Sequence, residues 1–130
     1  MRKTDFVVRF AGEGGQGLLT SATGFAQAHT QVGYHVQTFA TFPSQILGGP
    51  TWTQARVSPN EVLSPGDAVD ILVAFNDYAY LEHRGEVRKG GVILHDPSVK
   101  PDHDASEIRT IEIPFDDLAK KTGESRAANM

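Results

Sequence analysis

The chain has 130 residues, of which 39% are hydrophobic and 22% charged, and its formal net charge at pH 7 is −4. These values are typical of a globular protein, and we expect one domain spanning residues 1–130. The negative charge argues against nucleic acid or an anionic membrane as a partner, because such binders usually present a basic face. Cysteine is absent, which excludes disulfides and thiolate-bound Fe–S clusters. Without a membrane-spanning apolar run or a signal-peptide core, we expect a cytoplasmic protein.

Apolar runs of strand length alternate along the chain with segments of helical pattern. The expected strands are 6–11, 34–41, 51–57, 71–75, 92–95 and 108–113. The expected helices are 18–32, 76–82 and 115–121, with Gly33 as a C-terminal cap and Asn76 as an N-terminal cap. Turns are predicted at 64–67 and 89–91. This alternation predicts an α/β fold with a mostly parallel sheet and helices on both faces.

The end of the sequence has the pattern of a helix start. Ser125 has the character of an N-cap, yet the sequence stops at Met130, about one turn into the helix that it would begin. We therefore expect the chain to be truncated inside an element at its C-terminus.

The most informative motif lies between the first expected strand and the first expected helix and reads Gly12-Glu13-Gly14-Gly15-Gln16-Gly17. A strand, a glycine turn and a helix together direct backbone N–H groups and a helix N-terminus at an anion. The glycine spacing matches the dinucleotide-binding fingerprint, which also needs an acidic residue about twenty positions further on. No Asp or Glu occurs between Glu13 and Glu61, which weakens the NAD interpretation. A nucleotide-triphosphate loop is weaker still, since no lysine lies between Lys3 and Lys89.

A second glycine pair, Gly48-Gly49, follows the 34–41 strand. Loops after parallel strands share one edge of a sheet, so we expect the two glycine segments to be neighbours. The residues alone leave two interpretations open: a ligand-binding edge, or glycines that only permit a tight turn and close packing. Glu13 is equally ambiguous, because a carboxylate near a helix N-terminus is favourable with or without a functional role.

Other polar residues do not form a recognisable catalytic or metal-binding pattern. The five histidines are scattered, and Ser21 and Ser44 lack triad partners, so we expect no metal site and no catalytic residue in this chain. His95-Asp96-Pro97 is predicted to cap a strand end. Trp52 and Phe42, which flank the second glycine pair, are interpreted as core or subunit-interface residues.

Several segments, in this order and spacing, resemble the gamma subunit or gamma domain of 2-oxoacid:ferredoxin (acceptor) oxidoreductases. Residues 9–17 resemble the opening of that family's domain, and 44–49 resemble its second glycine loop; the further matching segments are 56–58, 70–74, 90–96 and 129–130. The resemblance implies a complex that oxidatively decarboxylates a 2-oxoacid to an acyl-CoA and passes electrons to ferredoxin or another acceptor. It also implies alpha and beta subunits or domains as partners, which hold thiamine diphosphate, Mg and the Fe–S clusters. The gamma domain is often fused to the alpha subunit, so the chain is expected to be a fragment, a processed piece or a split subunit.

The resemblance implies that this chain contributes the coenzyme A side of a site completed by its partners and is inactive alone. The residues implied to contact coenzyme A are Gly12, Glu13, Gly14, Gly15, Gln16, Gly17, Gly48 and Gly49. One departure is Leu47, which stands where the family often has an arginine, so the expected anion contact would have to come from Arg9, Arg56 or a partner chain. Two alternatives stay open: a small NAD-type oxidoreductase domain, and a non-catalytic scaffold subunit.

Overall fold

The computed structural model describes residues 5–13, 18–41, 50–64, 66, 68–101 and 107–121. The described elements are β1 (Phe6–Glu13), α1 (Leu18–Gln31), β2 (His35–Thr41), β3 (Pro50–Ser58), β4 (Val69–Ala74), α2 (Asp77–His83), the 3₁₀ turn η1 (Arg84–Glu86), β5 (Val87–His95), β6 (Arg109–Glu112) and α3 (Phe115–Lys121). The helix expected after Ser125 lies outside the described residues, as do Pro65 and Asp67 of one expected turn.

The strands form one mixed sheet in the order β2-β3-β1-β4-β5-β6. The pairs β1–β4, β4–β5 and β5–β6 are parallel, whereas β3 runs antiparallel to both of its neighbours. Strand β2 therefore points the same way as the parallel strands, and only β3 is reversed. The predicted α/β fold with a mostly parallel sheet is confirmed.

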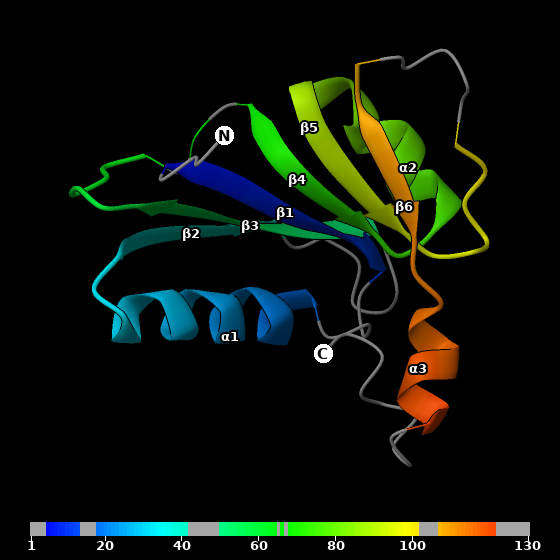
Figure 1. Ribbon diagram of the computed structural model, residues 1–130, viewed down its shortest axis with the longest axis horizontal. Helices are drawn as coiled ribbons and strands as arrows, with labels where there is room; N and C mark the ends of the chain where they lie inside the picture. Colours follow the sequence, from blue (N-terminus) through cyan, green and yellow to red (C-terminus); the bar gives the residue numbers. More distant parts are fainter. Residues whose placement is uncertain are drawn as a thin grey trace.

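Helix α1 covers the face of the sheet built by alternate residues of β1, β3 and β4. Val8, Ala55 and Val73 form the buried centre of this layer, and Phe25 of α1 packs against it. The Phe25 ring lies edge-on to Phe10, with centroids 6.2 Å apart. Figure 1 shows α1 beneath β2, β3 and β1, because the period-two side chains of the strands present one apolar face to it.

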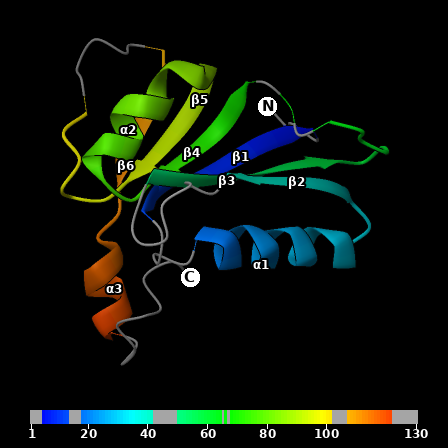
Figure 2. The same ribbon diagram turned by 180° about the vertical axis from the view of Figure 1, so that it is seen from behind.

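Helix α2 covers the opposite face, over β4 and β5. Leu72, Tyr80 and Ile93 are almost fully buried there, together with Ala11 of β1. Figure 2 shows the same arrangement from behind, with α1 and α2 on opposite sides of the sheet. The strand β4 is apolar on both faces for this reason, as its continuous hydrophobic run predicts.

Both predicted helix caps are confirmed. Gly33 has a φ of +94°, in the left-handed region that favours glycine, directly after α1. The Asn76 side chain accepts a hydrogen bond of 2.8 Å from the Ala79 N–H, so it caps α2. Helix boundaries accordingly fall within one residue of those expected at these two points.

The turn predicted at residues 89–91 is wrong, because strand β5 runs through it from Val87 to His95. Gly90 adopts a φ of +81°, and the pairing register of β5 with β4 shifts here. Gly91 lies so close to Val87 and to the Asp70 carbonyl that a Cβ would meet them at 2.6 and 2.9 Å. The glycines thus permit an irregular, crowded strand and do not end it.

Candidate functional site

The two glycine segments leave the sheet from paired strand ends. Glu13, the last residue of β1, pairs with Pro50, the first residue of β3, and Gly12 pairs with Thr51. Thr41, the last residue of β2, pairs with Trp52. Gly12 and Glu13 therefore lie at the carboxyl edge of the sheet, beside the strand end that follows residues 42–49. The other six expected contact residues lie outside the described residues: Gly14, Gly15, Gln16, Gly17, Gly48 and Gly49.

Hydroxyl groups hold these strand ends and the start of α1 together. The Thr51 hydroxyl donates to the Thr41 carbonyl, and the Thr41 hydroxyl accepts from the Trp52 N–H at 3.4 Å. The buried Thr53 hydroxyl donates to the Leu18 carbonyl at 3.1 Å. The start of α1 is thereby fixed to β3, at the same edge as Gly12.

The strands that end at this edge provide carboxylates and no lysine or arginine. Their last residues are Glu13 of β1, Thr41 of β2, Ala74 of β4, His95 of β5 and Glu112 of β6. An anionic ligand therefore finds no cationic partner among these strand ends. The described edge instead offers main chain and the N-terminus of α1, whose first turn holds no acidic residue.

His95 and Asp96 cap the end of β5, as predicted. The buried His95 donates through Nδ1 to the Asp96 carbonyl at 3.0 Å. The Asp96 carboxylate accepts from the Ser98 N–H at 3.0 Å. These contacts are the turn geometry typical of Asp after a strand.

A buried cationic cluster lies on the α2 face of β1 and β3. The Arg9 side chain is 4% exposed. Its Nε and Nη2 donate to Gln54 Oε1 at 2.8 and 2.6 Å, and its Nη1 donates to His83 Nδ1 at 3.0 Å and to the Glu86 carboxylate. The guanidinium also lies 4.2 Å from the centroid of the Trp52 ring. One side chain thus joins β1, β3, α2 and η1.

The cluster is electrostatically demanding because it is desolvated. Burial lowers the pKa of Arg9 from its ordinary value to about 10. Burial, and then the charge of Arg9, lower the pKa of His83. A neutral His83 is therefore favoured, and neutral imidazole supplies the acceptor that Arg9 contacts.

Neither described arginine considered for the anion contact is positioned to make it. Arg9 is occupied inside the cluster, four residues before the end of β1. Arg56 donates to the Asp5 carboxylate at 3.1 and 3.0 Å and to the Ser64 hydroxyl. A partner chain is the alternative that stays open from the sequence. The cluster itself had no sequence signal, since its members are far apart in the chain.

The position of Trp52 agrees with its interpretation as a core or interface residue. Its ring is partly buried against the α2-side core and lies 5.4 Å from the Phe39 ring. Phe39 is 46% exposed. In the part of the chain that the structure describes, no group of His, Asp and Glu residues is arranged to hold a metal ion, and no helix is long and apolar enough to cross a bilayer.

Comparisons with known proteins find close relatives for nearly the whole chain. Ketoisovalerate oxidoreductase subunit VorA of Methanothermobacter marburgensis is 36% identical over 123 residues, which are 94% of this chain and 26% of that subunit. 2-Oxoglutarate synthase subunit KorC of Methanothermobacter thermautotrophicus is 30% identical over 92% of this chain and 65% of its own length. The chain therefore spans about a quarter of VorA and about two thirds of KorC.

Solved structures give the same result. The 2-oxoglutarate:ferredoxin oxidoreductase from Magnetococcus marinus, with 2-oxoglutarate, coenzyme A and succinyl-CoA bound, matches with a TM-score of 0.89 and 33% identity over 98% of this chain and 23% of that chain. A keto/oxoacid ferredoxin oxidoreductase gamma subunit from Geobacter sulfurreducens shares the fold, with a TM-score of 0.84 and 23% identity over 98% of this chain and 71% of that one. The family described as pyruvate ferredoxin/flavodoxin oxidoreductase matches residues 7–130. The chain belongs to this family.

Proposed function

We propose that this chain is the gamma component of a 2-oxoacid:ferredoxin (acceptor) oxidoreductase. The complex would convert a 2-oxoacid to an acyl-CoA and pass the electrons to ferredoxin or another acceptor. Alpha and beta subunits or domains would supply thiamine diphosphate, Mg and Fe–S clusters, while this chain supplies surface on the coenzyme A side. We also propose a cytoplasmic location, which fractionation of the native host tests.

The paired ends of β1 and β3 carry this proposal. The Glu13–Pro50 pair brings the flanks of both glycine segments to one edge, next to the N-terminus of α1. A relative 33% identical over this region belongs to an enzyme whose structure holds coenzyme A. The likeness and the geometry therefore support the same edge of the sheet as the contact surface.

The division of labour follows from the charges at this edge. Main-chain N–H groups and a helix N-terminus bind polar and anionic groups. The strand ends add carboxylates, and Arg9 and Arg56 are already occupied, so we infer that partner subunits provide the cations for the phosphates of coenzyme A. Iron–sulfur clusters do not fit this chain through thiolates, since it contains no cysteine.

The first test is turnover with and without partners. We expect the purified chain to show no activity with a 2-oxoacid, coenzyme A and a dye acceptor, and to gain activity only in the complex. Mass spectrometry of proteins that co-purify with it identifies the partners. Turnover by the chain alone would refute the proposal.

A second test introduces bulk into the glycine loop by Gly15→Val. We expect at least a tenfold rise in the coenzyme A KM of the complex, or failure of the complex to assemble, because a branched side chain obstructs close approach of a ligand or partner. Gly85→Val is the matched control, since a Cβ at Gly85 meets nothing within 4 Å. Unchanged assembly together with an unchanged coenzyme A KM would make the loop merely structural.

The family membership does not favour a free-standing NAD-type domain. Calorimetric titration of NAD into the isolated chain checks this alternative, which predicts binding without partners. A non-catalytic scaffold subunit differs from the proposal in one respect: its glycine loop could be changed without an effect on the coenzyme A KM.

A further inference from the structure

One long stretch of the chain carries no formal charge outside its histidines. All twelve Lys and Arg and all sixteen Asp and Glu lie outside residues 14–55. The stretch contains α1, β2 and the first part of β3. A free surface normally mixes charges of both signs, whereas the core of a protein interface is depleted of them.

The outward side of α1 is exposed and uncharged. Its exposed residues are Thr20, Thr23, Gly24, Gln27, Ala28, Thr30 and Gln31. Thr20, Gly24 and Ala28 are spaced by four and so lie on one line along the helix. A Cβ at Gly24 would meet nothing within 4 Å in this chain. The line of small residues leaves room for another backbone to come close to α1.

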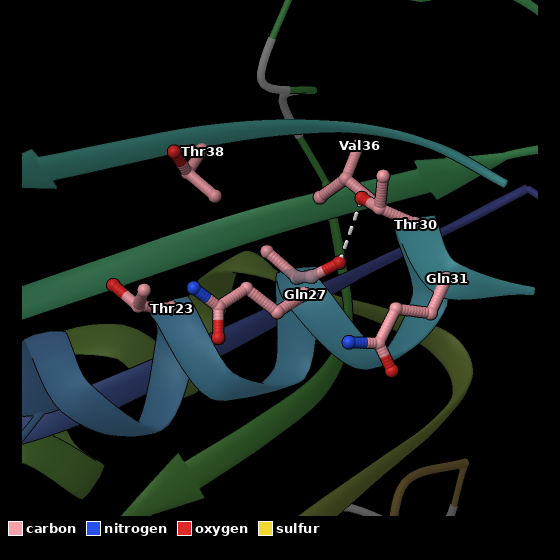
Figure 3. Close-up of a pocket in the computed structure, with 7 residues that line it drawn as sticks. Thr23, Gln27, Thr30, Gln31, Val36 and Thr38 are labelled. Atoms are coloured by element: carbon pink, nitrogen blue, oxygen red, sulfur yellow. Dashed lines mark hydrogen bonds between the residues drawn. The ribbon is translucent and has the colours of Figure 1, made fainter.

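A groove runs between α1 and the edge strand β2. Its volume is about 570 Å³, and its lining comes from the two elements: Thr23, Ala26, Gln27, Thr30, Gln31, Val36 and Thr38. Figure 3 shows the side chains of α1 below β2, with the Thr30 hydroxyl bonded to the Ala26 carbonyl and so turned back onto its own helix. A smaller hollow of about 320 Å³ adjoins it at Thr20 and Gly24.

The strand β2 is an edge without the usual protection. Among the described strands it pairs only with β3, and none of its seven residues is buried. Natural proteins usually protect such edges with charged side chains or proline, and β2 contains neither. A neutral edge beside a neutral groove indicates a surface that is covered in the assembled protein.

We propose that this neutral face, formed by the outward side of α1 and by β2, is an interface covered by a helix from another domain or subunit of the same oxidoreductase. The occupant is uncharged and rich in small and apolar residues where it contacts α1, because a charged helix would find no partner there. A helix fits the groove, which follows the direction of α1, and the small residues suit helix packing at 8–10 Å between axes.

Another part of the same enzyme is favoured over a second copy of this chain. The VorA relative and the Magnetococcus enzyme subunit are about four times as long as the part that matches this chain. This domain therefore has covalently attached neighbours in those proteins. The neutral stretch also includes the residues of both glycine segments from Gly14 to Gly49, so the proposed interface continues toward the proposed contact edge. The proposal rests on the proposed function in this respect.

The test is a charge insertion in the intact complex. Thr23→Lys with Gln27→Lys places two cations on the neutral face at exposed helical positions, where lysine is compatible with the helix. We expect at least tenfold less partner oxidoreductase subunit to co-purify, with an unchanged circular dichroism spectrum and Tm of the isolated chain. Thr23→Val with Gln27→Met keeps the face neutral and should retain most of the partner.

Tyr78→Lys with Leu81→Lys is the matched control on α2, at side chains 58% and 51% exposed. It should retain the partner, and equal losses from both lysine pairs would overturn the proposal. Hydrogen exchange provides a second readout: the amides of α1 and β2 should become protected in the complex relative to the isolated chain.

The outcomes separate this proposal from the proposed function. If the wild-type chain co-purifies with no oxidoreductase subunit, the proposed function fails. If it does so, and the Thr23→Lys/Gln27→Lys variant still assembles with unprotected α1 and β2, only the interface proposal fails. A wild-type homodimer that this variant dissociates, while the heteromeric complex survives, would assign the face to a second copy and would also overturn the proposal.

Discussion

The half of the molecule around α1 and β2 differs sharply from the half around α2, β4, β5 and β6. The second half satisfies its charges internally or at its own surface: Arg88 Nε lies 2.9 Å from the Asp70 carboxylate, and Lys89 Nζ lies 3.2 Å from that of Glu107. The first half has no such pairs, because it has no charges to pair. One half is therefore self-contained, whereas the other is built to be completed by something else.

Arg9 shows how the self-contained half is held. It joins two strands to α2 and η1 from a nearly fully buried position, and Asp70 accepts from the Val7 N–H at 2.8 Å nearby. Buried polar groups of this kind are costly when a partner is removed. The neutral half has instead small side chains and amides at its surface, which change little in isolation. The comparison predicts large effects on stability in one half and effects on assembly in the other.

The largest effect on stability is expected from Arg9→Met. The substitution leaves Gln54 and His83 without their buried donor and removes the cation from the Trp52 ring, so we expect a loss of about 3 kcal/mol in the free energy of unfolding. Urea denaturation of the isolated chain at pH 7 measures it. Lys89→Ala, which breaks an exposed pair, should change the same quantity by less than about 0.5 kcal/mol. Equal losses in the two variants would contradict a stabilising role for the cluster.

Two glycine-to-alanine changes are expected to have opposite signs. Gly24→Ala should stabilise the isolated chain by about 1 kcal/mol, since alanine favours the helix and its Cβ meets nothing within 4 Å. Gly91→Ala should destabilise it by about 2 kcal/mol, because its Cβ would be pressed against main-chain oxygens that cannot move away. Thermal unfolding of both variants measures the difference. Destabilisation by Gly24→Ala would show that the neutral half is already packed against something within this chain.

The smallest effect is a dependence of stability on pH. Burial and the Arg9 charge lower the pKa of His83 in the folded state, so the unfolded chain binds its proton first as the pH falls. The stability that comes from neutral His83 is therefore complete above about pH 6.5 and is lost as the pH falls toward the folded pKa. His83→Gln, which keeps an acceptor for Arg9 but does not titrate, should lose less stability than the wild type between pH 7 and pH 5. Parallel pH profiles would show that His83 does not contribute.

The sequence predicted the features that depend on local pattern. Strand and helix positions follow from apolar periodicity, and the Asn76 and Gly33 caps follow from residue types with one dominant local use. Residues 89–91 were mispredicted as a turn because glycine permits a kinked strand as readily as a turn. The Arg9 cluster could not be predicted, since its partners lie 45 to 77 positions away in the chain. Of the predicted contact residues, Gly12 and Glu13 lie at the expected edge, and the binding role of all eight stays a prediction.

The reversed strand β3 also has a consequence for the order of folding. The pair of β2 and β3 closes contacts between residues 11 positions apart, such as Thr41 and Trp52, whereas Val7 and Asp70 are 63 positions apart. Local contacts cost less chain entropy and form earlier than distant ones. We therefore expect this hairpin to form before the parallel part of the sheet. A nascent chain would then display its uncharged edge early, so that assembly with other subunits would protect it from aggregation as well as complete an enzyme.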